Sequence, residues 1–208
     1  MYAQFKARAE GVSAEVYRFE THALALDFIV GFLQREGLAD KPKSYALWAE
    51  CPFLDGIDRQ ALAAVAGLEF QVTRELAADA RFGISQMGWA LADTGTLVQD
   101  SSAIEQRLVS SLPAIHIALA PTSGLLPDMP ELLTRLKPDS PVTQDKCVNE
   151  VISGQKTAEN IILRTKSAYI AMITGPSRTA DIERVLTIGV HGPERLVIVF
   201  VDDLGGAN

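Results

Sequence analysis

The sequence predicts an α/β protein with three α/β/α layers around a mixed, mostly parallel sheet. Short segments with strand character alternate with segments of helical periodicity, as expected for a sheet covered by helices on both faces. The apolar runs at 114–120 and 196–201 are almost uninterrupted, which is typical of strands buried on both sides. Between two other short apolar runs, the stretch 93–96 has the sequence DTGT, which predicts a hairpin and therefore at least one antiparallel pair.

The first eighty residues alternate regularly between the two kinds of segment. We expect helices at 1–10, 23–35, 57–66 and 73–80, and strands at 15–19, 45–49 and 68–72. In 23–35 the large apolar side chains recur near helical spacing, and Gly37 suits a helix stop. Thr73 is suited to cap the helix that follows it, because its hydroxyl can accept a hydrogen bond from a free amide of the first turn.

The remaining elements carry the polar motifs of the chain. Strands are expected at 89–92, 97–99, 114–120, 168–173 and 196–201, and a helix at 130–136. The polar stretch 137–166 contains Pro138, Pro141 and Gly154, and it predicts a mobile connection with one short helix. Gly175-Pro176 breaks the chain after the strand at 168–173, and we expect a further helix to begin there.

Length, composition and charge restrict the class of protein. A chain of 208 residues with 48% hydrophobic content can bury one substantial core, so we expect a single domain over 1–208. The net charge of −7 leaves no basic stripe for a nucleic acid, and no nucleic-acid partner is expected. Apolar stretches fall short of the roughly 20 residues of a membrane span. The beginning of the chain lacks an apolar signal core, so a cytoplasmic location is expected.

Cofactor motifs are missing from the sequence. Cys51 and Cys147 lie far apart with no CxxC spacing, so we expect two structural cysteines and no iron–sulfur cluster held by this chain. Phosphate-binding Walker loops, GxGxxG turns and GxSxG elbows are also lacking. The three histidines fall in separate segments whose spacing predicts no metal site.

The segment 173–179 is the first candidate ligand site. A helix start that follows a strand favours anions, because its amides are unpaired. Gly175 begins the turn, Ser177 and Thr179 offer hydroxyls to a carboxylate or phosphate, and Arg178 can form a bidentate pair with it. The alternative is an ordinary capped helix with a solvated Arg178.

His191 and Asp181 are the candidate catalytic residues. His191 lies in a Val-His-Gly-Pro turn, where an imidazole can act as general acid or base, or can simply fix the turn by a hydrogen bond. Asp181 is suited to orient Arg178 or a hydroxyl-bearing ligand. His116, within an apolar run, is expected to be a hydrogen-bonded core residue, and His22 a helix cap or a solvated side chain.

The hairpin at 93–96 is the second candidate ligand site. Gly95 allows close approach to the backbone, and the hydroxyls of Thr94 and Thr96 can contact a ligand. The alternative is that these residues only form a tight hairpin and bind no ligand.

Three strings carry a family resemblance. TGPSRTADIE at 174–183, GVHGPERL at 189–196 and ADTGTLV at 92–98 resemble the signature of the lactate-utilisation protein C family, which has a LUD domain. GIS at 83–85 and LPAIH at 112–116 also match, so the resemblance covers roughly 83–203. Earlier residues match in segment pattern only.

The resemblance implies a fold and a role. The family shares a superfamily with ribose-5-phosphate isomerase, glucosamine-6-phosphate deaminase and coenzyme A transferases, which implies the same α/β architecture. The implied role is a subunit of a three-component bacterial system that oxidises L-lactate to pyruvate, with iron–sulfur clusters in the partner subunits. This subunit would bind a small hydroxy or keto acid, a carboxylate ligand, or serve assembly, and the resemblance leaves its own catalysis undecided.

Two other interpretations stay open. One is a stand-alone enzyme acting on a sugar phosphate or an acyl thioester, as the superfamily relatives do. The transferases use a glutamate nucleophile, and no Glu lies in a glycine-rich turn to match it. The other is a scaffold whose ancestral site has decayed.

Overall fold

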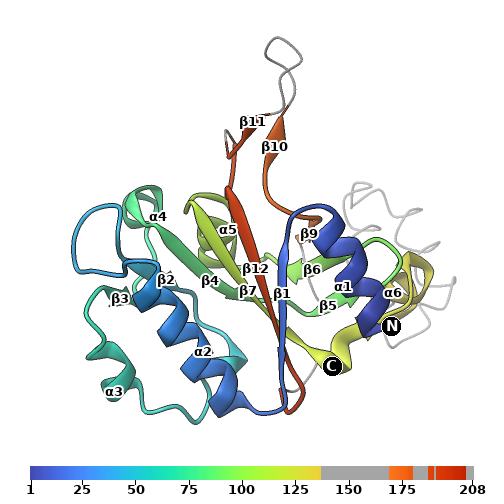
Figure 1. Cartoon of the computed structure of the whole chain (residues 1–208), viewed down its shortest axis with the longest axis horizontal. Helices are drawn as coiled ribbons and strands as arrows, with labels where there is room; N and C mark the ends of the chain where they lie inside the picture. The colour runs from blue at the N-terminus through green and yellow to red at the C-terminus, as the bar shows by residue number, and fades with distance from the viewer. Residues whose placement is uncertain (137–168, 180–186, 190, 205–208) are drawn as a thin grey trace, which may run out of the picture.

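The main sheet has six strands, all parallel (Figure 1). The computed structural model describes residues 1–136, 169–179, 187–189 and 191–204. In spatial order, the strands of the sheet are β1 (Glu15–Phe19), β12 (Arg195–Val201), β7 (Ile115–Pro121), β4 (Phe82–Gln86), β2 (Ala46–Trp48) and β3 (Leu68–Glu69). The predicted α/β fold with a mostly parallel sheet is confirmed.

A second, four-stranded sheet contains the antiparallel pair predicted from the sequence. Its order is β8 (Leu125–Leu126), β5 (Trp89–Leu91), β6 (Thr96–Asp100) and β9 (Ile170–Ile173). β5 and β6 form the predicted hairpin, and β9 pairs antiparallel with β6. This small sheet lies on one face of the main sheet rather than continuing it, because Ala90 and Leu97 share a buried cluster with Ala118 of β7 and Ile198 of β12.

Helices cover both faces of the main sheet. They are α1 (Tyr2–Gly11), α2 (His22–Arg35), α3 (Arg59–Ala63), α4 (Arg74–Asp79), α5 (Ile104–Ser111) and α6 (Met129–Arg135). In Figure 1, α2 lies in front of the main sheet and α5 behind it. Within the described residues, no helix is both long and apolar enough to cross a membrane.

β12 shows why two separate cores form. Because side chains alternate along a strand, Val197 and Val199 pack with α2 on one face, whereas Ile198 and Phe200 pack with α1 and the small sheet on the other. A strand buried on both faces must be apolar throughout, which explains the uninterrupted run at 196–201.

Helix starts follow the capping chemistry of the sequence. The Thr73 hydroxyl accepts a hydrogen bond from the Leu76 amide at 3.2 Å, which confirms the predicted cap of α4. At α2 the cap is Thr21, bound to the Leu24 amide at 3.3 Å, so the expectation of His22 as a helix cap is wrong; the alternative was a solvated side chain, and His22 is half-buried. His22 is the first helical residue, and its Nε2 contacts the carbonyl oxygen of Phe53.

Two other expectations about elements need correction. The predicted helix does not begin at 177–179, because Arg178–Thr179 form β10, which pairs antiparallel with β11 (Thr187–Ile188). The backbone there donates and accepts hydrogen bonds across a ladder instead of within a helical turn. Residues 180–186, and the expected connection at 137–166, lie outside the described part. Furthermore, β4 and α5 are elements that the sequence patterns did not predict.

Candidate functional site

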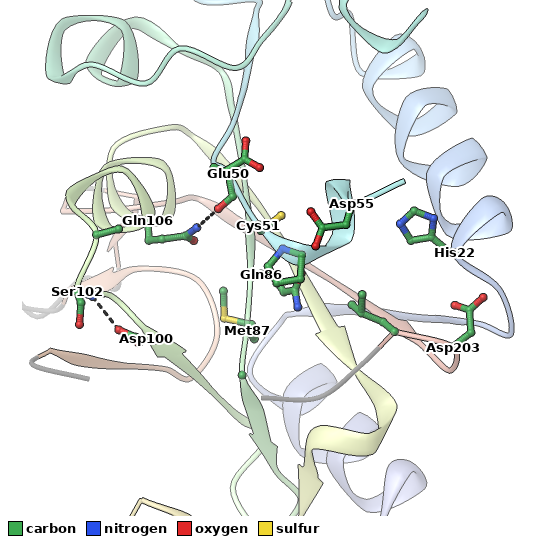
Figure 2. Close-up of a pocket in the computed structure, with 14 residues that line it drawn as sticks. His22, Glu50, Cys51, Asp55, Gln86, Met87, Asp100, Ser102, Gln106 and Asp203 are labelled. Carbon is green, nitrogen blue, oxygen red and sulfur yellow. Dashed lines mark hydrogen bonds between the residues drawn. The ribbon is translucent and has the colours of Figure 1, made fainter. Parts of the chain in front are cut away.

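A cavity of about 830 Å³ opens where strands of the main sheet end (Figure 2). Open α/β sheets usually bind ligands at the carboxyl ends of their strands. Its lining residues come from the loops after these strands, from the end of β6 and from the start of α5: His22, Glu50, Cys51, Pro52, Asp55, Gln86, Met87, Gly88, Asp100, Ser102, Ala103, Gln106, Asp203 and Leu204. Cavities of roughly 300–1,000 Å³ hold drug-sized ligands.

Strand order brings these residues together. His22 follows β1, Cys51 follows β2, Gln86 ends β4 and Asp203 follows β12. Parallel strands end at the same edge of a sheet, so residues separated by more than a hundred positions meet around one opening. Polar residues directly after apolar runs are the sequence signal for these positions, and the same signal predicts the site at 174–179.

Backbone groups fix the two amide side chains of the cavity. The Phe53 amide donates to Gln86 Oε1 at 2.8 Å, and Gln106 Nε2 donates to the Glu50 carbonyl oxygen at 2.8 Å. A backbone N–H can only donate and a carbonyl can only accept, so each contact determines which end of the amide faces which way. The side-chain oxygens of Gln86 and Gln106 therefore face protein groups.

A chain of buried polar side chains lies behind Gln106. Gln99 Nε2 donates to Gln106 Oε1 at 3.1 Å and to Ser85 Oγ at 2.8 Å, while Gln99 Oε1 accepts from Ser101 Oγ at 3.0 Å. Ser85 Oγ lies 2.8 Å from His116 Nε2. Ser85, Gln99, Ser101 and His116 are completely buried. Buried polar networks of this kind rigidify their surroundings when their members are paired.

His116 is neutral in this environment. Burial lowers its pKa to about 4, because the charged imidazolium would lose its hydration. Ser85 Oγ accepts a hydrogen bond from Gln99 and shares a second one with His116 Nε2, in which either atom can be the donor, while His116 Nδ1 has no described partner. Ser85 and His116 do not form a catalytic pair, because both are fully buried and no substrate can reach them. The expectation of a core histidine is confirmed.

Carboxylates dominate the charge of the cavity. The described lining contains Glu50, Asp55, Asp100 and Asp203 but neither Lys nor Arg. Glu50 forms a two-bond pair with Arg59, which lowers the Glu50 pKa through the hydrogen bond from the guanidinium. The cavity therefore disfavours anions.

Cys51 is a structural cysteine in the cavity wall. Burial raises its pKa to about 11, so the thiol is protonated and is neither a good nucleophile nor a ready metal ligand. The expectation of a buried Cys51 is confirmed, whereas Cys147 lies outside the described residues. Among the described residues, no three His, Cys, Asp or Glu side chains are arranged to hold a metal ion.

The residues predicted as a site from the sequence lie elsewhere, beside the amino ends of β1 and β12. Their shared neighbours are the turn after α1 and the loop before β12. Arg178 Nη2 donates to the Val12 carbonyl oxygen and to Ser13 Oγ at 2.7 Å, and the Ser177 amide donates to the Pro193 carbonyl oxygen at 2.8 Å. The predicted residues whose side chains are described are absent from the cavity lining: Thr94, Gly95, Thr96, Gly175, Ser177, Arg178 and His191.

The contacts and exposure of the predicted site residues differ from one residue to the next. Thr96 is nearly buried, and its Oγ1 lies 2.7 Å from Thr174 Oγ1, so the two motifs are in direct contact. Gly95 has a φ of +71°, and a Cβ there would lie 2.6 Å from the Ala9 amide nitrogen, so close packing against α1 requires glycine. Thr94 and His191 are exposed, and Asp181 lies outside the described residues. The roles proposed for these residues in ligand binding and catalysis remain predictions.

Comparison with known proteins identifies similar sequences. The family model of the LUD domain matches residues 2–201. Lactate utilization protein C of Exiguobacterium sp. is 35% identical over 64% of this chain and 50% of that protein. The protein of the same name from Macrococcus caseolyticus is 33% identical over 75% of this chain and 60% of that protein, and the Bacillus subtilis protein 34% over 61% and 45%. The chain thus spans about half the length of the curated relatives it matches.

A solved structure has the same fold. A DUF162 family protein from Deinococcus radiodurans superimposes with a TM-score of 0.55 and 16% identity, over 96% of this chain and 95% of that one.

Proposed function

Because the chain belongs to the LUD domain family, we propose that it serves L-lactate utilisation, as a subunit of a bacterial system that oxidises L-lactate to pyruvate. The match of the LUD domain model to residues 2–201, together with relatives named lactate utilization protein C, carries the proposal. In this role the subunit binds a small hydroxy or keto acid, or it assembles with partner subunits that carry iron–sulfur clusters.

The charges of the described residues favour assembly over binding of a free acid in the cavity. Like charges about 4 Å apart repel by about 1 kcal/mol in water and about 4 kcal/mol near a protein surface. The described lining has four carboxylates and no Lys or Arg, and Arg59 pairs with only one of these carboxylates, Glu50, which weighs against lactate or pyruvate there. The same charges weigh against the alternative of a sugar-phosphate enzyme.

The redox centres of the proposed system belong to its partners. Cys51 is a protonated, buried thiol and offers no thiolate to a cluster. We therefore assign the iron–sulfur clusters to the partner subunits and none to this chain.

Growth on lactate tests the proposed role. Deleting the gene should abolish growth on L-lactate as sole carbon source and leave growth on pyruvate and glucose normal. A plasmid copy should restore growth. Normal growth of the deletion strain on L-lactate would contradict the proposal.

Co-purification tests the assembly. The tagged chain, isolated from its own cells, should bring down proteins whose visible absorption bleaches on reduction, as iron–sulfur clusters do. The same chain purified alone should be colourless and should not reduce dyes with lactate. Lactate oxidation by the isolated chain would instead place the redox chemistry here.

A further inference from the structure

The two amide side chains of the cavity present hydrogen-bond donors to its interior. Gln86 Oε1 is occupied by the Phe53 amide, and Gln106 Oε1 by Gln99 Nε2. An amide nitrogen has two hydrogens. Gln106 Nε2 uses one of them on the Glu50 carbonyl oxygen, and the described residues offer no partner to the other or to Gln86 Nε2. Figure 2 shows both side chains at the cavity, one from the end of β4 and the other from α5.

These orientations are built into the fold. Turning Gln86 over would place its amide nitrogen against the Phe53 N–H, two donors facing each other. Turning Gln106 over would place its oxygen against the Glu50 carbonyl and its nitrogen against Gln99 Nε2. Gln99 is itself fixed by Ser85 and Ser101 in the fully buried network. Each reversal loses a part-buried hydrogen bond, and that of Gln106 also loses the exposed bond to Glu50, so the donors are preorganised.

The remaining polar groups of the wall set the charge of the ligand. Carboxylate oxygens accept hydrogen bonds and repel anions; Glu50 is paired with Arg59, and Asp55 and Asp203 add two further carboxylates to a described lining that contains no Lys or Arg. A ligand that matches both features has an acceptor oxygen for the amides and no negative charge.

We propose that this cavity binds an uncharged carbonyl compound, whose carbonyl oxygen accepts a hydrogen bond from the amide nitrogen of Gln86, while the amide nitrogen of Gln106 is a second donor to the ligand. The carboxylates of the wall accept from hydroxyl or N–H groups of the same ligand. The volume of about 830 Å³ holds a ligand larger than a three-carbon acid. This binding site does not depend on the proposed lactate role, which is tested by growth and co-purification.

Lactamide and L-lactate test the site, because they share a carbon skeleton and differ in charge. In the ¹⁵N-labelled full chain, lactamide should shift the side-chain amide signals of Gln86 and Gln106, and L-lactate at equal concentration should shift them less. Equal or larger shifts with L-lactate would show that the site accepts anions and would overturn the proposal. Absence of shifts with lactamide would overturn it as well.

One substitution at Gln86 removes its N–H donors and keeps the contact that fixes its side chain. Gln86→Glu keeps an oxygen for the Phe53 amide but removes both donors, so lactamide affinity should fall by about three- to tenfold, as for one lost neutral hydrogen bond. The matched control is Gln4→Glu, which makes the same change on the exposed side of α1 and should leave the affinity unaltered. Unchanged affinity in Gln86→Glu, with a normal melting temperature, would show that this amide does not contact the carbonyl.

Discussion

Ser85, Gln99 and His116 form a polar layer between the main sheet and the small sheet, where apolar side chains would normally pack. The arrangement holds Gln106 in the cavity wall through Gln99. It also keeps His116 neutral, because nothing in the described surroundings compensates an imidazolium. A single buried histidine thereby makes the stability of the protein depend on pH.

Acid should destabilise the protein through His116. The folded pKa of about 4 lies below the ordinary histidine pKa of 6.5, so between these two pH values the unfolded chain binds a proton that the folded chain does not. The stability that comes from keeping His116 neutral is fully present above pH 6.5 and is lost as the pH falls towards 4. Between pH 7 and pH 5 this linkage costs about 2 kcal/mol of unfolding free energy.

Urea denaturation of wild type and His116→Leu at the two pH values measures this effect. The variant removes one titrating group and leaves every carboxylate in place, so it should lose about 2 kcal/mol less than wild type between pH 7 and pH 5. The quantity to compare is the change in unfolding free energy between the two pH values. The variant also loses the Ser85 hydrogen bond, but it does so at both pH values. Equal losses in the two proteins would show that the pKa of His116 is the same in the folded and the unfolded chain.

At the scale of elements, β4 and α5 determine the shape of the cavity. Gly83 of β4 lies directly beneath α5, where a Cβ would come within 1.9 Å of the Val109 carbonyl oxygen and 2.9 Å of Pro113 Cγ. This contact sets how near α5, and with it Gln106, lies to the strand ends. Glycine is needed for the close approach of the helix, and the backbone of Gly83 has no positive φ.

Gly83→Ala should therefore be strongly destabilising. The helix must move away from the strand to make room, and overpacking of this kind costs about 1–3 kcal/mol or more. Gly11→Ala is the control, because a Cβ at Gly11 meets nothing within 4 Å and no loss of stability is expected. Chemical denaturation of both variants measures the two changes, and equal stabilities would show that α5 adjusts freely.

At the scale of the whole molecule, the two ends of the described chain are paired. β1 and β12 are neighbours in the main sheet, with Glu15 opposite Val197 and Phe19 opposite Val201. α2 covers the face formed by β12 and β7, since Ile29 and Leu33 share a cluster with their inward side chains. The motif-bearing residues 83–203 thus depend on the first eighty residues for one side of their core.

The fragment 83–208 should not fold alone. Without α2 and β1–β3 it exposes one face of the remaining strands, so it should show no cooperative thermal transition by circular dichroism and should be digested rapidly. The whole chain should unfold in one transition as a single domain. A cooperative transition in the fragment, with native near-ultraviolet signals, would instead make 83–208 an independent domain.

Local patterns determined most of the elements. The strand predicted at 15–19 has the bounds of β1, the run at 196–201 falls within β12, and Thr73 caps α4. These features depend on neighbouring residues alone: periodicity, a capping hydroxyl, a glycine at a turn. β4 was missed because its sequence, FGISQ, has no apolar run, and its polar side chains pair with partners distant in sequence.

Only the tertiary structure decided where the cavity lies. The sequence motifs around Thr94–Thr96 and Ser177–Thr179 meet beside the amino ends of β1 and β12, and the cavity opens at the other end of the strands. The spatial order β1-β12-β7-β4-β2-β3 brings His22, Gln86 and Asp203 together, and no local pattern encodes that order. Sheet order follows from which faces must be buried against which helices, a property of the whole chain rather than of any segment.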